Sequence, residues 1–160
     1  MNSIIPKRII LDTNVCLDLF VFQDPRWERL LAGLQNGSLK AFTRPECRDE
    51  WLAVLKYPHL PITAENVESI KIQHDHYIEC VSPESRAEIK LPICTDKDDQ
   101  KFLEIARDTE SHFLITKDKA LLKLAKRIRK LGLFSVLTPE AFLANDDGNS
   151  PQTVFNQSKE

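Results

Sequence analysis

The chain alternates between short apolar runs and longer segments whose apolar residues recur three and four positions apart. The apolar runs predict five strands, over residues 8–11, 39–42, 77–81, 112–115 and 134–137. The other segments predict helices over 15–22, 27–34, 46–55, 63–74, 101–107 and 119–130, with a last helical turn at 139–143. Because strands and helices alternate, we expect one α/β domain with a central, mostly parallel five-stranded sheet flanked by helices.

The length and composition set the limits of that domain. A chain of 160 residues with 42% hydrophobic and 29% charged residues is typical of one soluble globular unit. We expect the domain to cover residues 1–144, and the polar, turn-rich segment 145–160 to form a flexible tail. The sequence has no apolar stretch near the roughly 20 residues that cross a bilayer and no signal-peptide pattern, so we expect a cytoplasmic protein without a membrane partner.

The charge pattern is uneven along the chain. A net charge of −2 carries no global signal for nucleic acid binding. Residues 95–99 nevertheless read TDKDD, whereas residues 117–130 read KDKALLKLAKRIRK. The four cysteines lie at no zinc-site spacing. An acidic pocket beside a basic flank suits a nuclease, although chance also produces such a pattern.

Acidic residues stand at several positions where predicted strands end and helices begin. Asp12 closes the first strand, and Asp118 comes just after the fourth. Ligands of open α/β sheets bind beyond the carboxyl ends of the strands, so these positions indicate a functional cleft. The acids near such junctions are Asp12, Glu50, Asp96, Asp98, Asp99 and Asp118.

Each of these acids also has a structural explanation. An Asp before a helix is a favoured N-cap, and acids in the first turn suit the helix dipole, which applies best to Asp96, Asp98 and Asp118. Asp12 fits that explanation less well, since it should point into the cleft after a buried strand. Gathered carboxylates repel one another unless some protonate or a cation binds, and oxygen ligands favour Mg²⁺ or Mn²⁺. The acids therefore indicate metal-assisted phosphate-ester chemistry without specifying RNA.

Five motifs resemble those of the PIN domains, and within them the bacterial toxin components of toxin–antitoxin pairs. They are ILDTNV at 10–15, RPECRDEWLAVLKYP at 44–58, CTDKDDQKFLEIA at 94–106, LITKDKALL at 114–122 and VLTPEAFL at 136–143. The resemblance spans residues 7 to about 144 and implies a single PIN-like domain. It also implies that the metal-binding, catalytic acids are Asp12, Glu50, Asp99 and Asp118.

The resemblance places two small polar residues, Asn14 and Thr116, beside these acids. We expect them to hydrogen-bond a carboxylate or a water, with helix capping as the alternative explanation. The chain departs from the family pattern at three positions. It has Lys117 where a glycine is common, and Gln100 and Ala120 where acids are common.

The resemblance implies an Mg²⁺- or Mn²⁺-dependent endoribonuclease that cuts single-stranded RNA and acts as the toxin of a toxin–antitoxin pair. An activated water would attack the phosphorus in line, so no protein nucleophile is required. Basic residues near the acids are expected to contact RNA phosphates, and the candidates are Arg44, Arg48, Lys117 and Lys119. A small antitoxin protein and a homodimer remain open as further partners.

Two other enzyme and signalling classes fail at named positions. A haloacid-dehalogenase-like phosphatase needs a second Asp where this chain has Asn14. A response-regulator receiver needs an Asp after the third strand and a Lys after the fifth, where the chain has Ser82 and Thr138. The remaining alternative is a PIN fold used as an RNA- or protein-binding module with little or no turnover. Divalent-metal binding at Asp12 and Asp99 would distinguish it from the nuclease.

Overall fold

A parallel sheet lies at the centre of the protein in the computed structural model, which describes residues 5–145. Its strands are β1 (Lys7–Leu11), β2 (Leu39–Thr43), β3 (Ile78–Cys80), β4 (Phe113–Ile115) and β5 (Ser135–Leu137). The strand order is β3-β2-β1-β4-β5, and all four pairings are parallel. The predicted α/β class with a five-stranded, mostly parallel sheet is confirmed.

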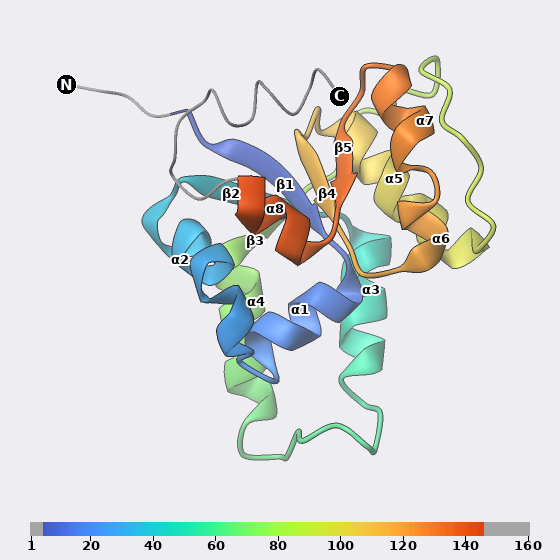
Figure 1. The fold of residues 1–160 in the computed structure, drawn as a ribbon. Helices are drawn as coiled ribbons and strands as arrows, with labels where there is room; N and C mark the ends of the chain where they lie inside the picture. The colour runs from blue at the N-terminus through green and yellow to red at the C-terminus, as the bar shows by residue number, and fades with distance from the viewer. Residues whose placement is uncertain (1–4, 146–160) are drawn as a thin grey trace.

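Helices connect the strands and cover the sheet on both sides (Figure 1). They are α1 (Thr13–Phe20), α2 (Glu28–Asn36), α3 (Pro45–Val54), α4 (Val67–Tyr77), α5 (Gln100–Asp108), α6 (Lys119–Leu122), α7 (Ala125–Lys130) and α8 (Pro139–Asn145). Two short 3₁₀ turns, η1 (Pro25–Trp27) and η2 (Lys97–Asp99), precede α2 and α5. None of the helices within residues 5–145 combines the length and the hydrophobicity that spanning a bilayer requires.

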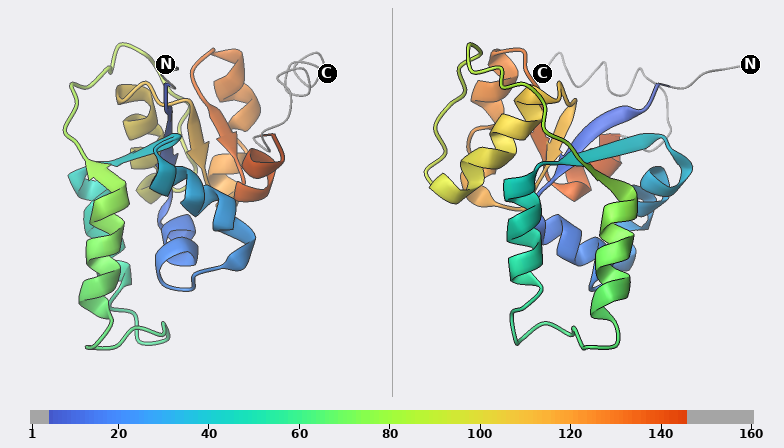
Figure 2. Two further views of the ribbon diagram at one scale, coloured as in Figure 1. Left: turned by 90° about the vertical axis from the view of Figure 1, so that its left-hand side faces the viewer. Right: turned by 180° about the vertical axis from the view of Figure 1, so that it is seen from behind.

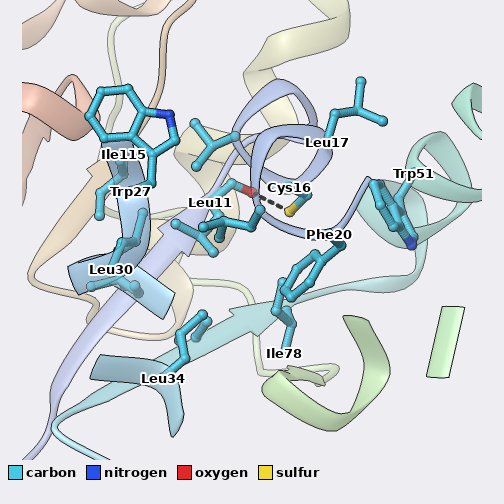
Figure 3. Packing of buried hydrophobic residues seen from close by; sticks show 14 of the residues in the cluster. Leu11, Cys16, Leu17, Phe20, Trp27, Leu30, Leu34, Trp51, Ile78 and Ile115 are labelled. Atoms are coloured by element: carbon cyan, nitrogen blue, oxygen red, sulfur yellow. Dashed lines mark hydrogen bonds between the residues drawn. The ribbon is translucent and has the colours of Figure 1, made fainter. Parts of the chain in front are cut away.

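The alternation of side chains along β1 divides the interior into two cores. Ile9 and Leu11 point to one face of the sheet and pack with α1, α2, α4 and α8. Ile10 points to the other face and packs with α5, α6 and α7. Successive residues of a strand alternate in direction, so a strand buried on both faces must be apolar throughout, as β1 is. Figure 3 shows Leu11, Phe20 and Trp51 in the first core, where β1, α1 and α3 meet.

Helices α3 and α4 extend side by side beyond the carboxyl edge of the sheet, joined by a loop at their far ends (Figures 1 and 2). Aromatic packing holds them together. The ring of Trp51 stacks on that of His74, with centroids 4.7 Å apart, and the rings of Phe20 and Trp51 meet edge to face, with centroids 6.2 Å apart. Because these rings come from α1, α3 and α4, they fix the helical pair against the end of the sheet.

The structure corrects three predicted boundaries. The helix predicted over 119–130 is two short helices, and the break at Lys123–Leu124 lets both Leu121 and Ile128 be fully buried. The helix predicted from Thr63 begins at Val67, since Thr63 and Asn66 hydrogen-bond each other in a turn. The strand predicted over 77–81 covers only 78–80.

The predicted domain end at residue 144 falls inside α8, which ends at Asn145. The rest of the predicted tail, residues 146–160, lies outside the described residues, as do residues 1–4.

Candidate metal centre and active site

An acidic cavity of about 450 Å³ opens where β1 and β4 end. In the sheet, β1 lies between β2 and β4. The chain places β2 and β3 on one side of β1 and then crosses to place β4 and β5 on the other side, so the cavity lies at the switch point of the sheet. Its lining includes the amide side chain of Asn14 and six carboxylates. They belong to Asp12, Glu50, Asp96, Asp98, Asp99 and Asp118. The structure thus brings all four acids of the predicted site to one cavity.

Asp12 is held rigidly at the end of β1, with only 4% of its surface exposed. Its Oδ1 accepts a hydrogen bond of 2.9 Å from the backbone N–H of Val15 and so caps α1. Its Oδ2 accepts from the hydroxyl of Thr116 and, at 3.4 Å, from the backbone N–H of Lys117. Burial raises the pKa of Asp12 above its ordinary value, against the effect of these hydrogen bonds. Asp12 therefore caps α1 and also lines the acidic cavity.

Thr116 connects the two strand ends that carry Asp12 and Asp118. Its side chain is fully buried, donates to Asp12, and accepts a hydrogen bond of 2.9 Å from the backbone N–H of Asp118. Asp118 in turn caps α6, because its Oδ1 accepts from the backbone N–H of Ala120 at 2.8 Å. This network orients both carboxylates toward the cavity that they line.

Asp96, Asp99 and Asp118 form a cluster, which we call the acidic triad. Each offers a carboxylate oxygen, and these oxygens lie within 4.8 Å of one another. The Oδ2 atom of Asp99 is buried and has no hydrogen-bond partner. Burial raises the pKa of Asp99 to about 7, together with a hydrogen bond that its protonated form makes with Asp118, the charge of Asp118, and smaller contributions from Asp96 and Glu50. An oxygen-only cluster with one unsatisfied buried atom fits a hard divalent cation, which would replace the missing proton.

Glu50, the fourth predicted acid, is paired within the protein. Its Oε2 accepts from the hydroxyl of Thr13 at 2.5 Å, and its Oε1 lies 2.6 Å from the ammonium of Lys101. These partners come from α1 and α5, whereas Glu50 lies on α3, so no local sequence pattern could have indicated them.

Asp96 was predicted as one of the acids near the cleft, with helix capping as the alternative explanation, and it does cap η2 through the backbone N–H of Asp98 at 3.0 Å. It also belongs to the acidic triad. Asp96 and Asp99 are three residues apart at a helix start. That spacing places side chains on one side and could have indicated their shared role.

Three of the four predicted RNA contacts lie in ion pairs. Arg44 pairs with Glu104 at 2.8 Å, Arg48 binds both carboxylate oxygens of Asp75, and Lys117 lies 2.6 Å from Asp18. The fourth, Lys119, is exposed and has no ion pair within the described residues 5–145.

Comparison with known proteins identifies the family. The family model described as PIN domain matches residues 8–120, a span that includes all four predicted acids. No curated protein matches the chain closely enough to make the assignment more specific. PIN domains are generally nucleases and typically use a divalent metal, which agrees with the acidic cluster at the switch point of this sheet. The chain belongs to the PIN domain family.

Proposed function

We propose that this protein is an Mg²⁺- or Mn²⁺-dependent endoribonuclease that hydrolyses phosphodiester bonds of single-stranded RNA. The observation that carries the proposal is the acidic triad, in which a buried carboxylate oxygen of Asp99 lacks a partner. Such a cluster is unfavourable without a cation, and its all-oxygen donors suit a hard ion better than zinc. The cavity beside it has room for a phosphate group and part of a nucleotide.

The proposed metal centre keeps Asp12, Asp99 and Asp118 from the acids predicted from the sequence and adds Asp96. Glu50, the fourth predicted acid, lines the same cavity but is already paired with Lys101. Asp99 and Asp118, with Asp96, would hold the ion, and Asp12 would complete the set from the end of β1. When bound, the metal supplies Lewis-acid stabilisation of the charge that develops on the phosphate oxygens.

The side chains of the cavity support hydrolysis in distinct ways. Asp12, held by Thr116 and by the N-terminus of α1, can accept a hydrogen bond from the attacking water and orient it for in-line displacement. Asn14 lies exposed at the cavity lining, where its amide can donate to a phosphate oxygen. Lys119, next to Asp118, offers an exposed ammonium to the RNA backbone.

The role of the nuclease in the cell is a further part of the proposal. The motif resemblance supports the toxin of a toxin–antitoxin pair, acting in the cytoplasm, with a small antitoxin as inhibitor. Expression of the wild-type chain in bacteria should then arrest growth, whereas Asp99→Asn should not. Equal growth with both variants would contradict the toxin role and leave the nuclease proposal intact.

One observation favours the second candidate function, a binding module with little turnover. Arg44, Arg48 and Lys117 are all engaged by acids of the protein, which reduces the positive charge offered to RNA. Rapid turnover needs RNA to be bound as well as a metal centre, so only an activity measurement separates the two functions.

The decisive experiment measures cleavage of a labelled single-stranded RNA by the purified protein. The reactions contain Mg²⁺, Mn²⁺ or EDTA, and the variants are Asp12→Asn and Asp99→Asn. Glu110→Gln is a matched control, since Glu110 is an exposed carboxylate that precedes β4 and lies outside the acidic cavity. We expect metal-dependent cutting by the wild type and the control only. Cutting that persists in EDTA and in Asp99→Asn would come from a contaminant and would favour the binding module.

A further inference from the structure

Lys101 forms an ion pair with a carboxylate that lines the acidic cavity. Of the six carboxylates that line the cavity, only that of Glu50 forms an ion pair with a basic side chain within residues 5–145, and the partner is Lys101. The two charged atoms are 2.6 Å apart, and the Lys101 side chain is only 17% exposed. Its ammonium also donates to the backbone oxygen of Asp98 and lies 5.3 Å from the ring centroid of Phe102.

This ion pair differs from an ordinary surface salt bridge. Surface pairs between mobile side chains contribute little, whereas Lys101 is held by contacts with a carboxylate, a carbonyl oxygen and an aromatic ring. Largely burying two charges has a desolvation cost, which the close contact and the additional hydrogen bonds of Glu50 and Lys101 must offset. The position of Lys101, two residues after Asp99, places that charge next to the acidic triad in sequence.

The carboxylates of the cavity therefore fall into two groups. None of the three carboxylates of the acidic triad forms an ion pair with a basic side chain of the described residues, and the Oδ2 atom of Asp99 has no hydrogen-bond partner. Glu50 already has a cation on one oxygen and the Thr13 hydroxyl on the other. A divalent ion that bound Glu50 would have to displace the ammonium and would be repelled by it at close range.

We propose that Lys101 takes the place of a second divalent cation at Glu50, so that this chain binds a single Mg²⁺ or Mn²⁺ ion at Asp96, Asp99 and Asp118, with Asp12 completing the set. The inference rests on the metal centre of the proposed function and deepens it. Glu50 is then a positioning residue that holds Lys101 beside the centre, and it does not ligate the metal directly. An ammonium suits that position because it supplies one positive charge without the octahedral set of oxygens that Mg²⁺ requires.

The test counts Mn²⁺ ions per chain by calorimetry and electron paramagnetic resonance. We expect one ion in the wild type and in Lys101→Arg, which keeps the charge. Lys101→Met should bind a second ion, or bind Mn²⁺ at least about tenfold more tightly, because the carboxylate of Glu50 becomes available. The double variant Lys101→Met/Glu50→Gln should return to wild-type binding.

A second variant keeps the test decisive if Lys101→Met does not fold. Glu50→Gln alone should bind Mn²⁺ with the stoichiometry and affinity of the wild type, because Glu50 is not a ligand. Weaker binding by Glu50→Gln, two ions in the wild type, or unchanged binding by a folded Lys101→Met would each overturn the inference.

The outcome for Asp99→Asn separates this inference from the proposed function. If Asp99→Asn abolishes Mn²⁺ binding while Lys101→Met behaves as wild type, the metal centre stands and the role of Lys101 is wrong. If Asp99→Asn binds Mn²⁺ as tightly as the wild type, the acidic triad is not the metal centre, and both the proposed site and the inference built on it are wrong. A wild type and a Lys101→Met variant that both bind no Mn²⁺ would overturn both proposals.

Discussion

The cavities at the two ends of the sheet are lined by side chains of opposite charge, and these side chains differ in how many are paired within the protein. The acidic cavity lies at the carboxyl ends of the strands, whereas a cavity of about 600 Å³ lies at their amino ends. Its lining is rich in arginine and includes Arg8, Arg86, Arg107 and Arg129. Three of these guanidinium groups have acceptors in the protein. Arg8 donates to the carbonyl oxygen of Glu110, Arg86 lies 2.6 Å from the Glu110 carboxylate, and Arg107 lies 2.8 Å from that of Asp108.

A cluster of like charges in a cavity is therefore not by itself a sign of function, as the contrast between the arginine cluster and the acidic triad indicates. At the amino end, three of the four arginines are paired with neighbouring carboxylates or carbonyls, so most of this charge has a structural explanation. At the carboxyl end, the acidic triad forms no ion pair among the described residues, and the fold holds its three carboxylates close enough to repel one another. Charge that a protein leaves uncompensated in a cavity is more informative than charge that it pairs.

We expect the largest effect on RNA cleavage when the carboxylates of Asp99 and Asp118 are neutralised. Asp99→Asn/Asp118→Asn should reduce RNA cleavage by on the order of 10³-fold, because the charges that would hold the metal are removed. It should not lower the free energy of unfolding measured in EDTA at pH 8, since like-charge repulsion is removed as well. Urea denaturation and cleavage rates measure the two properties. A severe loss of stability would mean that the acidic triad supports the fold, and would erase the contrast between the two ends.

Breaking the buried ion pair between Arg107 and Asp108 at the amino end should lower stability and leave cleavage nearly unchanged. Arg107→Ala leaves the Asp108 carboxylate, which is 5% exposed, without its cation, and should lower the free energy of unfolding by about 3 kcal/mol. Cleavage by the folded fraction should stay within about twofold of the wild type. A stable but inactive Arg107→Ala would show that the amino end takes part in function.

The pH dependence of stability in EDTA should also distinguish the two ends. The pKa of Asp99 is raised to about 7 in the folded protein from an ordinary value of 3.8. The folded state therefore holds this proton more tightly than the unfolded chain. Its stabilising contribution is complete below pH 3.8 and is lost as the pH rises through about 7. The difference between wild type and Asp99→Asn isolates this contribution, and added Mn²⁺ should restore wild-type stability above pH 7. A difference that does not vary with pH would contradict the raised pKa.

The smallest effect should come from the exposed pair at the amino end. Glu110→Gln removes the partner of Arg86, but both side chains are exposed, so the free energy of unfolding should fall by at most about 1 kcal/mol. The carbonyl of Glu110 that binds Arg8 is unaffected by this change. A loss above about 2 kcal/mol, measured by urea denaturation, would show that the arginines depend on one another more than their separate contacts indicate.

Several features could be predicted because they depend on residues close together in the chain. The apolar run of β1 followed by Asp12 indicated both the buried strand and the acid at its end. The break between α6 and α7 escaped prediction, since helical periodicity continues through it and only packing of Leu121 and Ile128 on the sheet requires it. The place of Asp96 in the acidic triad was left open by the sequence, because helix capping explains an Asp at that position equally well.

The α/β class, the parallel sheet and the place of Asp12 at the end of β1 could be predicted from the sequence, because hydrophobic periodicity and position relative to a strand end are local properties. The grouping of Glu50, Asp99 and Asp118 with Asp12 was implied by the resemblance of the motifs to the PIN domains, and the structure places all four acids on one cavity. Which of these acids has a counter-ion depends on the tertiary structure. Lys101 reaches Glu50 across a contact between α5 and α3, while Asp99 meets Asp96 and Asp118 with no cationic side chain among the described residues. Charge compensation acts through space, and distance in space between remote segments is what folding sets.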